Sequence, residues 1–170
     1  MIWLRLLKKL LKALNADAAP SEVAGGVVLG AVIGITPTFS LHNLIILVLL
    51  IIVKVNISAA IFSAIVFGIA GYAVDGVSHS IGRYLLFSPP LERLWVFLYN
   101  TPLLALARLH NTVVLGSLLV SFIIMLPLFA LSKKFVLYYR SNLKQKVDKM
   151  KIVKILKASK IYHIYKKVKV

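Results

Sequence analysis

The sequence predicts an all-α integral membrane protein with two to four membrane spans, some of them broken or re-entrant. Hydrophobic residues make up 60% of the 170 residues, which is more apolar surface than a soluble domain of this size normally carries. Residues 23–53 contain no formal charge, but threonine and proline interrupt them near the middle. The 21 lysines and arginines outnumber the 5 acidic residues and gather toward the two ends of the chain. The chain has no cysteine, which excludes disulfides and thiolate sites.

Residues 1–18 are expected to form an amphipathic helix that lies in the membrane interface. The four cations of this segment fall on one helix face: Arg5, Lys8, Lys9 and Lys12. Large apolar residues occupy the other sides, so the helix can bury a wide apolar face at the acyl boundary. A helix packed on the protein's own surface is the alternative interpretation.

The membrane domain is expected to cover residues 19–131 and to begin with a helix that starts at Pro20. Glycines recur along this helix at every fourth residue, at Gly26, Gly30 and Gly34. Because residues four apart share a helix face, these glycines would let a second helix approach closely. We therefore expect a helix-packing role from them.

A polar break divides the charge-free run of residues 23–53. As one helix the run would reach about 46 Å, against about 30 Å of bilayer hydrocarbon. It is therefore either a bent, strongly tilted span or two half-helices that meet at the break. The break and the following helical turn contain six residues of interest: Thr36, Pro37, Thr38, Ser40, His42 and Asn43. They either bind an anion such as a lipid phosphate at the start of the second half-helix, or satisfy the backbone groups that Pro37 frees.

Two further segments are long enough to cross a bilayer, residues 57–74 and residues 112–131. After the first of them, Asp75, His79 and Arg83 follow one another at helical spacing. We expect a polar interfacial cap in which Asp75 pairs with Arg83 or His79. One carboxylate and one histidine are too few ligands for a catalytic zinc ion, and no nucleophile–base arrangement is visible. No catalytic, metal or cofactor site is therefore expected.

The break has a weak echo later in the chain, where Thr-Pro, Leu-His-Asn and an apolar helix follow one another again. The polar residues of the second copy are Thr101, Pro102, His110 and Asn111. If the echo is a true repeat, each half has one re-entrant segment and one crossing helix, in inverted orientation. Four conventional spans are the alternative. Lys54 would be cytoplasmic in the first topology and outside in the second.

Residues 132–170 are expected to form a basic cytoplasmic tail. Thirteen lysines and arginines face a single acidic residue there, which places both termini in the cytoplasm under the positive-inside rule. Four of the lysines recur at every third residue: Lys151, Lys154, Lys157 and Lys160. On a tail tethered to a membrane, this pattern favours binding to anionic lipid over binding to nucleic acid. Docking of an acidic partner protein is a further use of such a helix.

Small residues and prolines spread over residues 15–131 carry a resemblance to a known family. The pattern consists of Ala19-Pro20, Gly30, Gly34, Pro37, Leu41-His42, Asn56-Ile57-Ser58 and Asp75. It resembles the bacterial membrane proteins grouped as domain of unknown function 2062, and residues 110–117 look like the longer, two-part members of that group. Related domains occur beside envelope and glycosyltransferase functions. The resemblance implies a bacterial membrane location and a lipid-facing context, and it does not imply a reaction.

From these observations we expect a small, non-enzymatic protein of the bacterial inner membrane that assists the handling or transport of envelope lipid or lipid-linked carriers. Its expected partners are membrane lipids, and beyond them an envelope protein or a second copy of the chain. A structural anchor or scaffold subunit for another envelope protein is the alternative function. A channel is disfavoured, because the spans are few and their ionisable residues sparse.

Overall fold

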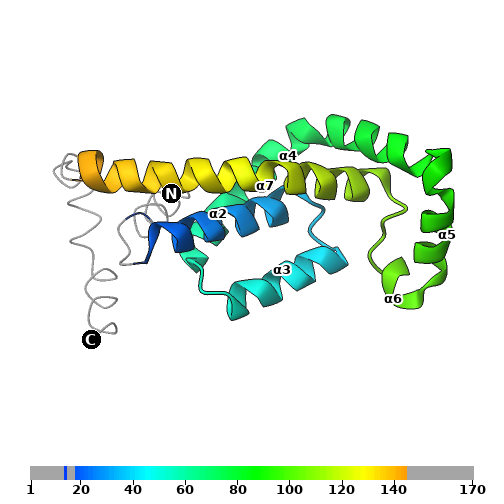
Figure 1. Ribbon diagram of the computed structural model, residues 1–170, viewed down its shortest axis with the longest axis horizontal. Helices are drawn as coiled ribbons and strands as arrows, with labels where there is room; N and C mark the ends of the chain where they lie inside the picture. The colour runs from blue at the N-terminus through cyan, green and yellow to red at the C-terminus, as the bar shows by residue number, and fades with distance from the viewer. Residues whose placement is uncertain (1–13, 15–17, 145–170) are drawn as a thin grey trace.

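A computed structural model describes residue 14 and residues 18–144. These residues form helices and turns without a strand (Figure 1). The elements follow in the order α2 (Pro20–Ile35), α3 (Leu41–Ile52), α4 (Ile57–Leu86), a 3₁₀ turn (Pro89–Leu91), α5 (Glu92–Asn100), α6 (Pro102–Ala105), α7 (Thr112–Tyr138) and a π-helical turn (Tyr139–Leu143). The expected interfacial helix of residues 1–18 lies almost wholly outside the described residues. So do the tail lysines Lys151, Lys154, Lys157 and Lys160.

Helices α2, α4 and α7 form the packed bundle of the molecule. Gly26 of α2 lies against Asn56, and Gly30 lies against Ala60 of α4, which shows that α2 runs parallel to the first half of α4. A Cβ atom added to Gly30 would collide with the carbonyl oxygen of Ala60, so the two backbones touch. Gly34 continues the contact one turn later, beside Ala64. The glycine face of α2 is thus a helix-packing face, with α4 as its neighbour.

The second half of α4 packs antiparallel against α7. A Cβ atom on Gly82 would collide with the carbonyl oxygen of Thr112, and one on Gly116 would collide with that of Ser78. Three serines are fully or almost fully buried along this contact: Ser78, Ser117 and Ser121. The bundle is therefore built from small residues that bring backbones together, rather than from a core of large apolar side chains.

Helices α4 and α7 are longer than the sequence predicts. The predicted span of residues 57–74 is the first part of α4, which has 30 residues and continues through Asp75 to Leu86. α7 continues past residue 131 to Tyr138, with Pro127 inside it. At about 1.5 Å per residue, the 30 residues of α4 reach about 45 Å. Within the described residues, these two segments, Ile57–Leu86 and Thr112–Leu143, are the helices long and apolar enough to cross a membrane.

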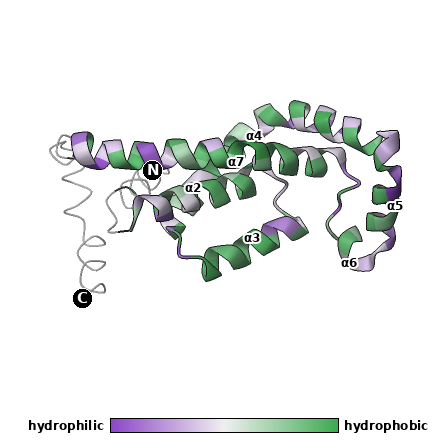
Figure 2. Ribbon diagram, in the orientation of Figure 1, coloured by the Kyte–Doolittle hydropathy of each residue, from purple (hydrophilic) through white to green (hydrophobic). Residues whose placement is uncertain are grey.

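Helix α3 lies at the edge of the bundle and runs back along α2 (Figure 1). Figure 2 shows it as hydrophobic along its length except at its first turn. Only Asn43 and Ile46 are buried in it, whereas Ile51 is 82% exposed. A helix that is apolar on almost every side and contacts only α2 closely leaves most of its apolar surface uncovered by the described part of the chain.

Helices α5 and α6 lie at the far end of α4 and α7 (Figure 1). α5 turns away from the axis of α4, and the indole of Trp95 holds it there by donating to the carbonyl oxygen of Leu85 at 2.9 Å. α6 has only 4 residues, and residues 106–110 after it form turns. Arg108 in this turn has a φ of 53°, the left-handed conformation.

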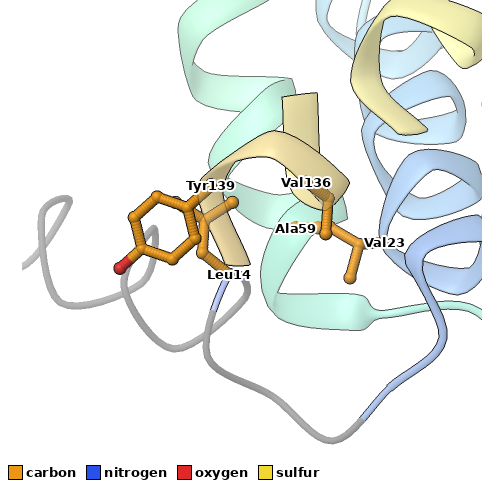
Figure 3. Packing of buried hydrophobic residues seen from close by; sticks show 5 residues of the cluster. All are labelled: Leu14, Val23, Ala59, Val136 and Tyr139. Atoms are coloured by element: carbon orange, nitrogen blue, oxygen red, sulfur yellow. The ribbon is translucent and has the colours of Figure 1, made fainter. Parts of the chain in front are cut away.

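The other end of the bundle gathers four segments around one apolar cluster (Figure 3). Its buried members are Leu14, Val23, Ala59, Val136 and Tyr139. Arg140 joins the segments further, because its Nε donates to the carbonyl oxygen of Leu14 at 3.1 Å and its Nη2 to that of Ala18 at 2.9 Å. The segment before α2 and the end of α7 therefore lie at the same end of the molecule.

Candidate functional site

The polar break lies at the tip of a helical hairpin formed by α2 and α3. The start of α2 and the residues after α3 lie close together, since the Lys54 ammonium pairs with the Glu22 carboxylate at 3.2 Å. The backbone N–H of Asn56 also donates to the carbonyl oxygen of Glu22 at 2.9 Å. Residues 23–53 are therefore two antiparallel half-helices and not one tilted span. At the tip, Gly34 and Ile35 pass beside Gly71, near the middle of α4.

Thr36 and Asn43 close the break with hydrogen bonds, and both are 3% exposed. The Thr36 hydroxyl lies 2.7 Å from the carbonyl oxygen of Val32 and 2.9 Å from Oδ1 of Asn43. The Asn43 amide nitrogen donates to the carbonyl oxygen of Pro37 at 3.0 Å and to that of Thr38 at 3.4 Å. The two bonds from Asn43 satisfy carbonyl groups of the break that lie outside a helix. The Val32 carbonyl also accepts the backbone N–H of Thr36 at 3.0 Å. Thr36 and Asn43 thus hold the backbone of the break together.

The remaining polar groups of the break differ in their access to a ligand. Thr38 is exposed, and the Phe39 side chain beside it is 92% exposed at the tip. The Ser40 hydroxyl lies 2.9 Å from Nε2 of His42, while Nδ1 of His42 is buried without a partner in the described part of the chain. Among the described residues, no hydrogen bond reaches the backbone N–H groups of residues 41–43 in the first turn of α3. Free N–H groups at a helix start are suited to an anion or to a polar headgroup.

The second Thr-Pro pair repeats one detail of the first and differs in the rest. The Thr101 hydroxyl donates to the carbonyl oxygen of Phe97 at 2.9 Å, as Thr36 does to the residue four positions earlier. Asn111 instead caps α7, because its Oδ1 accepts from the N–H groups of Val113 at 2.9 Å and Val114 at 3.2 Å. Pro102 begins the short α6.

The His110 ring meets the Tyr99 ring edge-on, with centroids 5.6 Å apart. No hydrogen bond joins the two breaks within the described part of the chain. They occupy different regions of the molecule, so the sequence echo does not produce one shared polar site.

The polar residues in the second half of α4 do not form the ion pair that we expected. They do lie on one continuous helix, as their spacing predicts. However, the one ion pair between described residues is Lys54–Glu22, so Asp75 pairs with neither His79 nor Arg83. Nδ1 of His79 lies 2.7 Å from the Thr112 hydroxyl instead. This contact joins α4 to the first residue of α7.

Sequence reasoning missed the small residues of the α4–α7 contact and a polar link between α2 and α4. The Ser63 hydroxyl donates to the carbonyl oxygen of Val27 at 2.6 Å and thereby joins these two helices. Gly82 follows Ser78 by four residues, and Ser121 follows Ser117 by four. This spacing is the same signal that identified the glycines of α2, so it could have located the second contact as well.

The described residues contain no cluster of three or more histidine, cysteine, aspartate or glutamate side chains that could hold a metal ion. The strongest candidate for a site is the break. Its exposed Thr38 side chain and the free N–H groups of the first turn of α3 lie beside the exposed apolar surface of that helix.

Residues 4–144 match the family described as "Uncharacterized protein conserved in bacteria (DUF2062)". The chain belongs to this family. The match includes the break, the polar residues of α4 and the second Thr-Pro pair, and it ends before the tail lysines. An uncharacterized protein of Treponema pallidum (strain Nichols) is 27% identical over 144 residues, which cover 85% of this chain and 89% of the relative. No solved structure matches the chain.

Proposed function

We propose that this member of the domain of unknown function 2062 family is a multi-pass, non-enzymatic protein of the bacterial inner membrane. In this proposal it assists the handling or transport of envelope lipid or lipid-linked carriers. Both termini lie at the cytoplasmic face, α4 and α7 cross the bilayer, and the α2–α3 hairpin enters from the cytoplasmic side without crossing.

Three features of the long helices support membrane insertion. Their apolar segments suffice for about 30 Å of hydrocarbon, and large apolar side chains on both helices are exposed, such as Ile69 and Leu126. Aromatic residues occur at both ends of the pair, with Tyr84 at the end of α4 and Tyr138 at the end of α7. Such belts are typical of membrane interfaces. The family description adds that the chain is bacterial.

The α2–α3 hairpin is too short to cross and too apolar to face water. α2 has 16 residues and α3 has 12, which correspond to about 24 Å and about 18 Å. The Lys54–Glu22 pair holds the start of α2 and the residues after α3 together at one end of the bundle. A re-entrant hairpin explains three observations together: the short helices, the closeness of the two hairpin ends and the exposed apolar surface of α3.

The observation that carries the lipid proposal is the position of the break beside an uncovered helix. Lipid tails are the natural cover for the exposed side chains of α3. The helix begins at a break that passes beside Gly71, halfway along a crossing helix. Thr38, His42 and the free N–H groups of the first turn would thus meet lipid at membrane depth. Polar groups there lower the cost of bringing a headgroup into the hydrocarbon.

The anchor function is the second candidate, and the hydrogen bonds of the break favour it. Thr36 and Asn43 use their polar groups on the chain's own backbone, which is what a purely structural kink requires. In that case the exposed face of α3 would contact an envelope protein instead of lipid.

Reconstitution of the full-length protein in liposomes separates the two functions. We expect it to accelerate the transbilayer movement of a fluorescent phospholipid, or of a labelled polyprenyl phosphate, relative to protein-free liposomes. The double variant T38A/H42A removes the exposed Thr38 hydroxyl and the partly buried His42 imidazole, and it should slow the movement. The variant T101A is the matched control at the second Thr-Pro pair and should not change it. No acceleration of either lipid by the wild-type protein, with an intact partner complex in pull-downs, would favour the anchor.

The topology has its own test, because the chain has no native cysteine. A cysteine that replaces Lys54 should react with a membrane-impermeant maleimide only from the cytoplasmic side, whereas an R83C cysteine should react only from the opposite side. Labelling of K54C from the outside would overturn the re-entrant hairpin.

A further inference from the structure

A cavity of about 560 Å³ lies on the second half of α4. It is at the opposite end of the bundle from Glu22 and Lys54, where the α2–α3 hairpin begins and ends. Its wall comes from two turns of α4 and from the turn that follows the helix. The lining residues are His79, Ser80, Arg83, Tyr84, Phe87, Ser88 and Pro89. The volume falls in the range of ordinary small-molecule sites, about 300–1,000 Å³.

The cavity carries positive charge and hydrogen-bond donors, and none of the described residues that line it has a carboxylate. The Arg83 guanidinium has no carboxylate partner among the described residues. His79 is held in place because its Nδ1 lies 2.7 Å from the Thr112 hydroxyl. When that hydroxyl donates to Nδ1, the other ring nitrogen, Nε2, carries a proton and is a donor. Arg83 and His79 are one helical turn apart, so both can reach the same anion.

The hydroxyl groups contribute differently to the cavity. The Ser80 hydroxyl donates to the carbonyl oxygen of Gly76 at 3.0 Å, so its proton is already used. The Ser88 and Tyr84 hydroxyls donate to no group within the described chain and remain able to donate to a ligand. The donor set is therefore one guanidinium, one imidazole and two hydroxyls, which suits the oxygens of a phosphate group.

The depth of the cavity suits a headgroup rather than an acyl chain. Gly82 lies against Thr112, so the cavity is level with the start of α7, where the apolar stretch of that helix begins. Tyr84 and Phe87 border the cavity and are each 77% exposed. Exposed aromatic rings beside a cation are typical of the zone where lipid headgroups meet hydrocarbon.

We propose that this cavity binds the phosphate group of an anionic phospholipid in the leaflet opposite the cytoplasm. The site depends on the membrane orientation of the proposed function but not on lipid movement. It would give the protein a second lipid contact, separate from the break, and it selects headgroups by charge. In a zwitterionic lipid the headgroup cation offsets the charge of the phosphate, so the attraction to Arg83 is weaker than for an anionic lipid.

Trp95 provides a local probe for this site. Its indole bonds to Leu85, two residues from Arg83, and it lies at the opposite end of the bundle from the end of α7 that leads into the basic tail. The chain has two tryptophans, so W3F leaves Trp95 as the single tryptophan. The experiment uses the full-length W3F protein in non-ionic detergent, titrated with brominated phosphatidylglycerol or with brominated phosphatidylcholine. Quenching by the first lipid at lower concentration measures the preference for anionic lipid near Trp95.

We expect a clear preference for phosphatidylglycerol, which R83Q lowers by about fivefold and H79Q by a smaller factor. The matched control is R108Q, which removes an exposed arginine from the same end of the molecule without touching the cavity. It should leave the preference unchanged. Inorganic phosphate in the millimolar range, against chloride of equal ionic strength, separates the sources of the anion. If it abolishes the excess quenching, the site takes free phosphate as readily as lipid, and the lipid assignment is wrong.

Other outcomes are equally decisive. A preference that R83Q leaves intact, in protein with unchanged helicity, overturns the site. A preference that R83Q and R108Q lower equally reports only general surface charge and also overturns it. A protein that shows the Arg83-dependent preference but does not accelerate lipid movement in liposomes retains this site while losing the proposed function.

Discussion

The two Thr-Pro segments of this chain begin alike and end in different structures. After Thr36-Pro37 the chain reverses into a 12-residue helix that returns along α2. After Thr101-Pro102 it makes a 4-residue helix and an exposed turn at the end of the bundle. The threonine bonds back to the preceding helix in both places. The Thr-Pro pair therefore ends a helix but does not determine the structure of the next segment.

Two other features account for the difference. Asn43 follows Thr36 by seven residues and reaches back to the carbonyls of the break, whereas Asn111 follows Thr101 by ten and caps the next helix instead. The helix before the first break also packs its glycines against α4, whereas α5 has no buried residue. Close packing of the preceding helix and a returning amide make the first segment a hairpin. Changes to each feature should therefore affect the first segment more than the second.

The glycine contact should give the largest effect. In G30A the new Cβ atom meets the backbone of Ala60 on α4, which cannot rotate away. We expect a loss near the upper end of the roughly 1–3 kcal/mol that overpacked interiors show. The measurement is the free energy of unfolding in mixed micelles, from titration with sodium dodecyl sulfate followed by circular dichroism.

The control for this variant is G76A on α4. A Cβ atom there has no described atom within 4 Å, and alanine is the better helix former, so stability should stay equal or rise. Equal losses from G30A and G76A would mean that the α2–α4 contact is not as close as the structure has it.

The asparagines should give the next effect, and they compare the two segments directly. N43A removes the amide that satisfies two backbone carbonyls and leaves the Thr36 hydroxyl with one neighbour fewer. Buried groups left without partners cost about 1–3 kcal/mol. N111A removes an exposed helix cap, which typically costs about 1 kcal/mol. The same unfolding titration should rank N43A as clearly more destabilising. The reverse order would show that the first break does not depend on Asn43.

Much of this architecture could be predicted from local pattern. The all-helical class, the start at Pro20, the interruption after Ile35 and the restart at Leu41 all follow from apolar runs and from proline. The family was also recognisable from its small residues and prolines. These features depend on neighbours in sequence, which is the reason that sequence alone indicates them.

The features that the sequence did not predict depend on contacts between distant segments. The sequence predicted an apolar span of residues 57–74, whereas α4 continues to Leu86, and its second half packs Gly82 and Ser78 against α7. Asp75 was expected to pair with His79 or Arg83, yet Thr112, 33 residues from His79, takes the place beside that imidazole. Whether the two breaks meet also depends on tertiary structure, and within the described residues no hydrogen bond connects them. A short sequence repeat carries no information about such distances.

The smallest effect belongs to the second segment alone, at Arg108 in the turn between α6 and α7. Its φ of 53° places a side chain in the left-handed region, which costs a residue with a Cβ atom about 1–2 kcal/mol. The side chain is exposed, and the backbone bonds of Arg108 to Ala105 and Asn111 do not involve it. Glycine relieves the strain but adds freedom to the unfolded chain, so R108G should gain only about 0.5 kcal/mol. R108A removes the same charge while keeping the strain, and should gain nothing in the same titration. A gain from alanine equal to that from glycine would assign the effect to the lost charge and not to relief of backbone strain at this position.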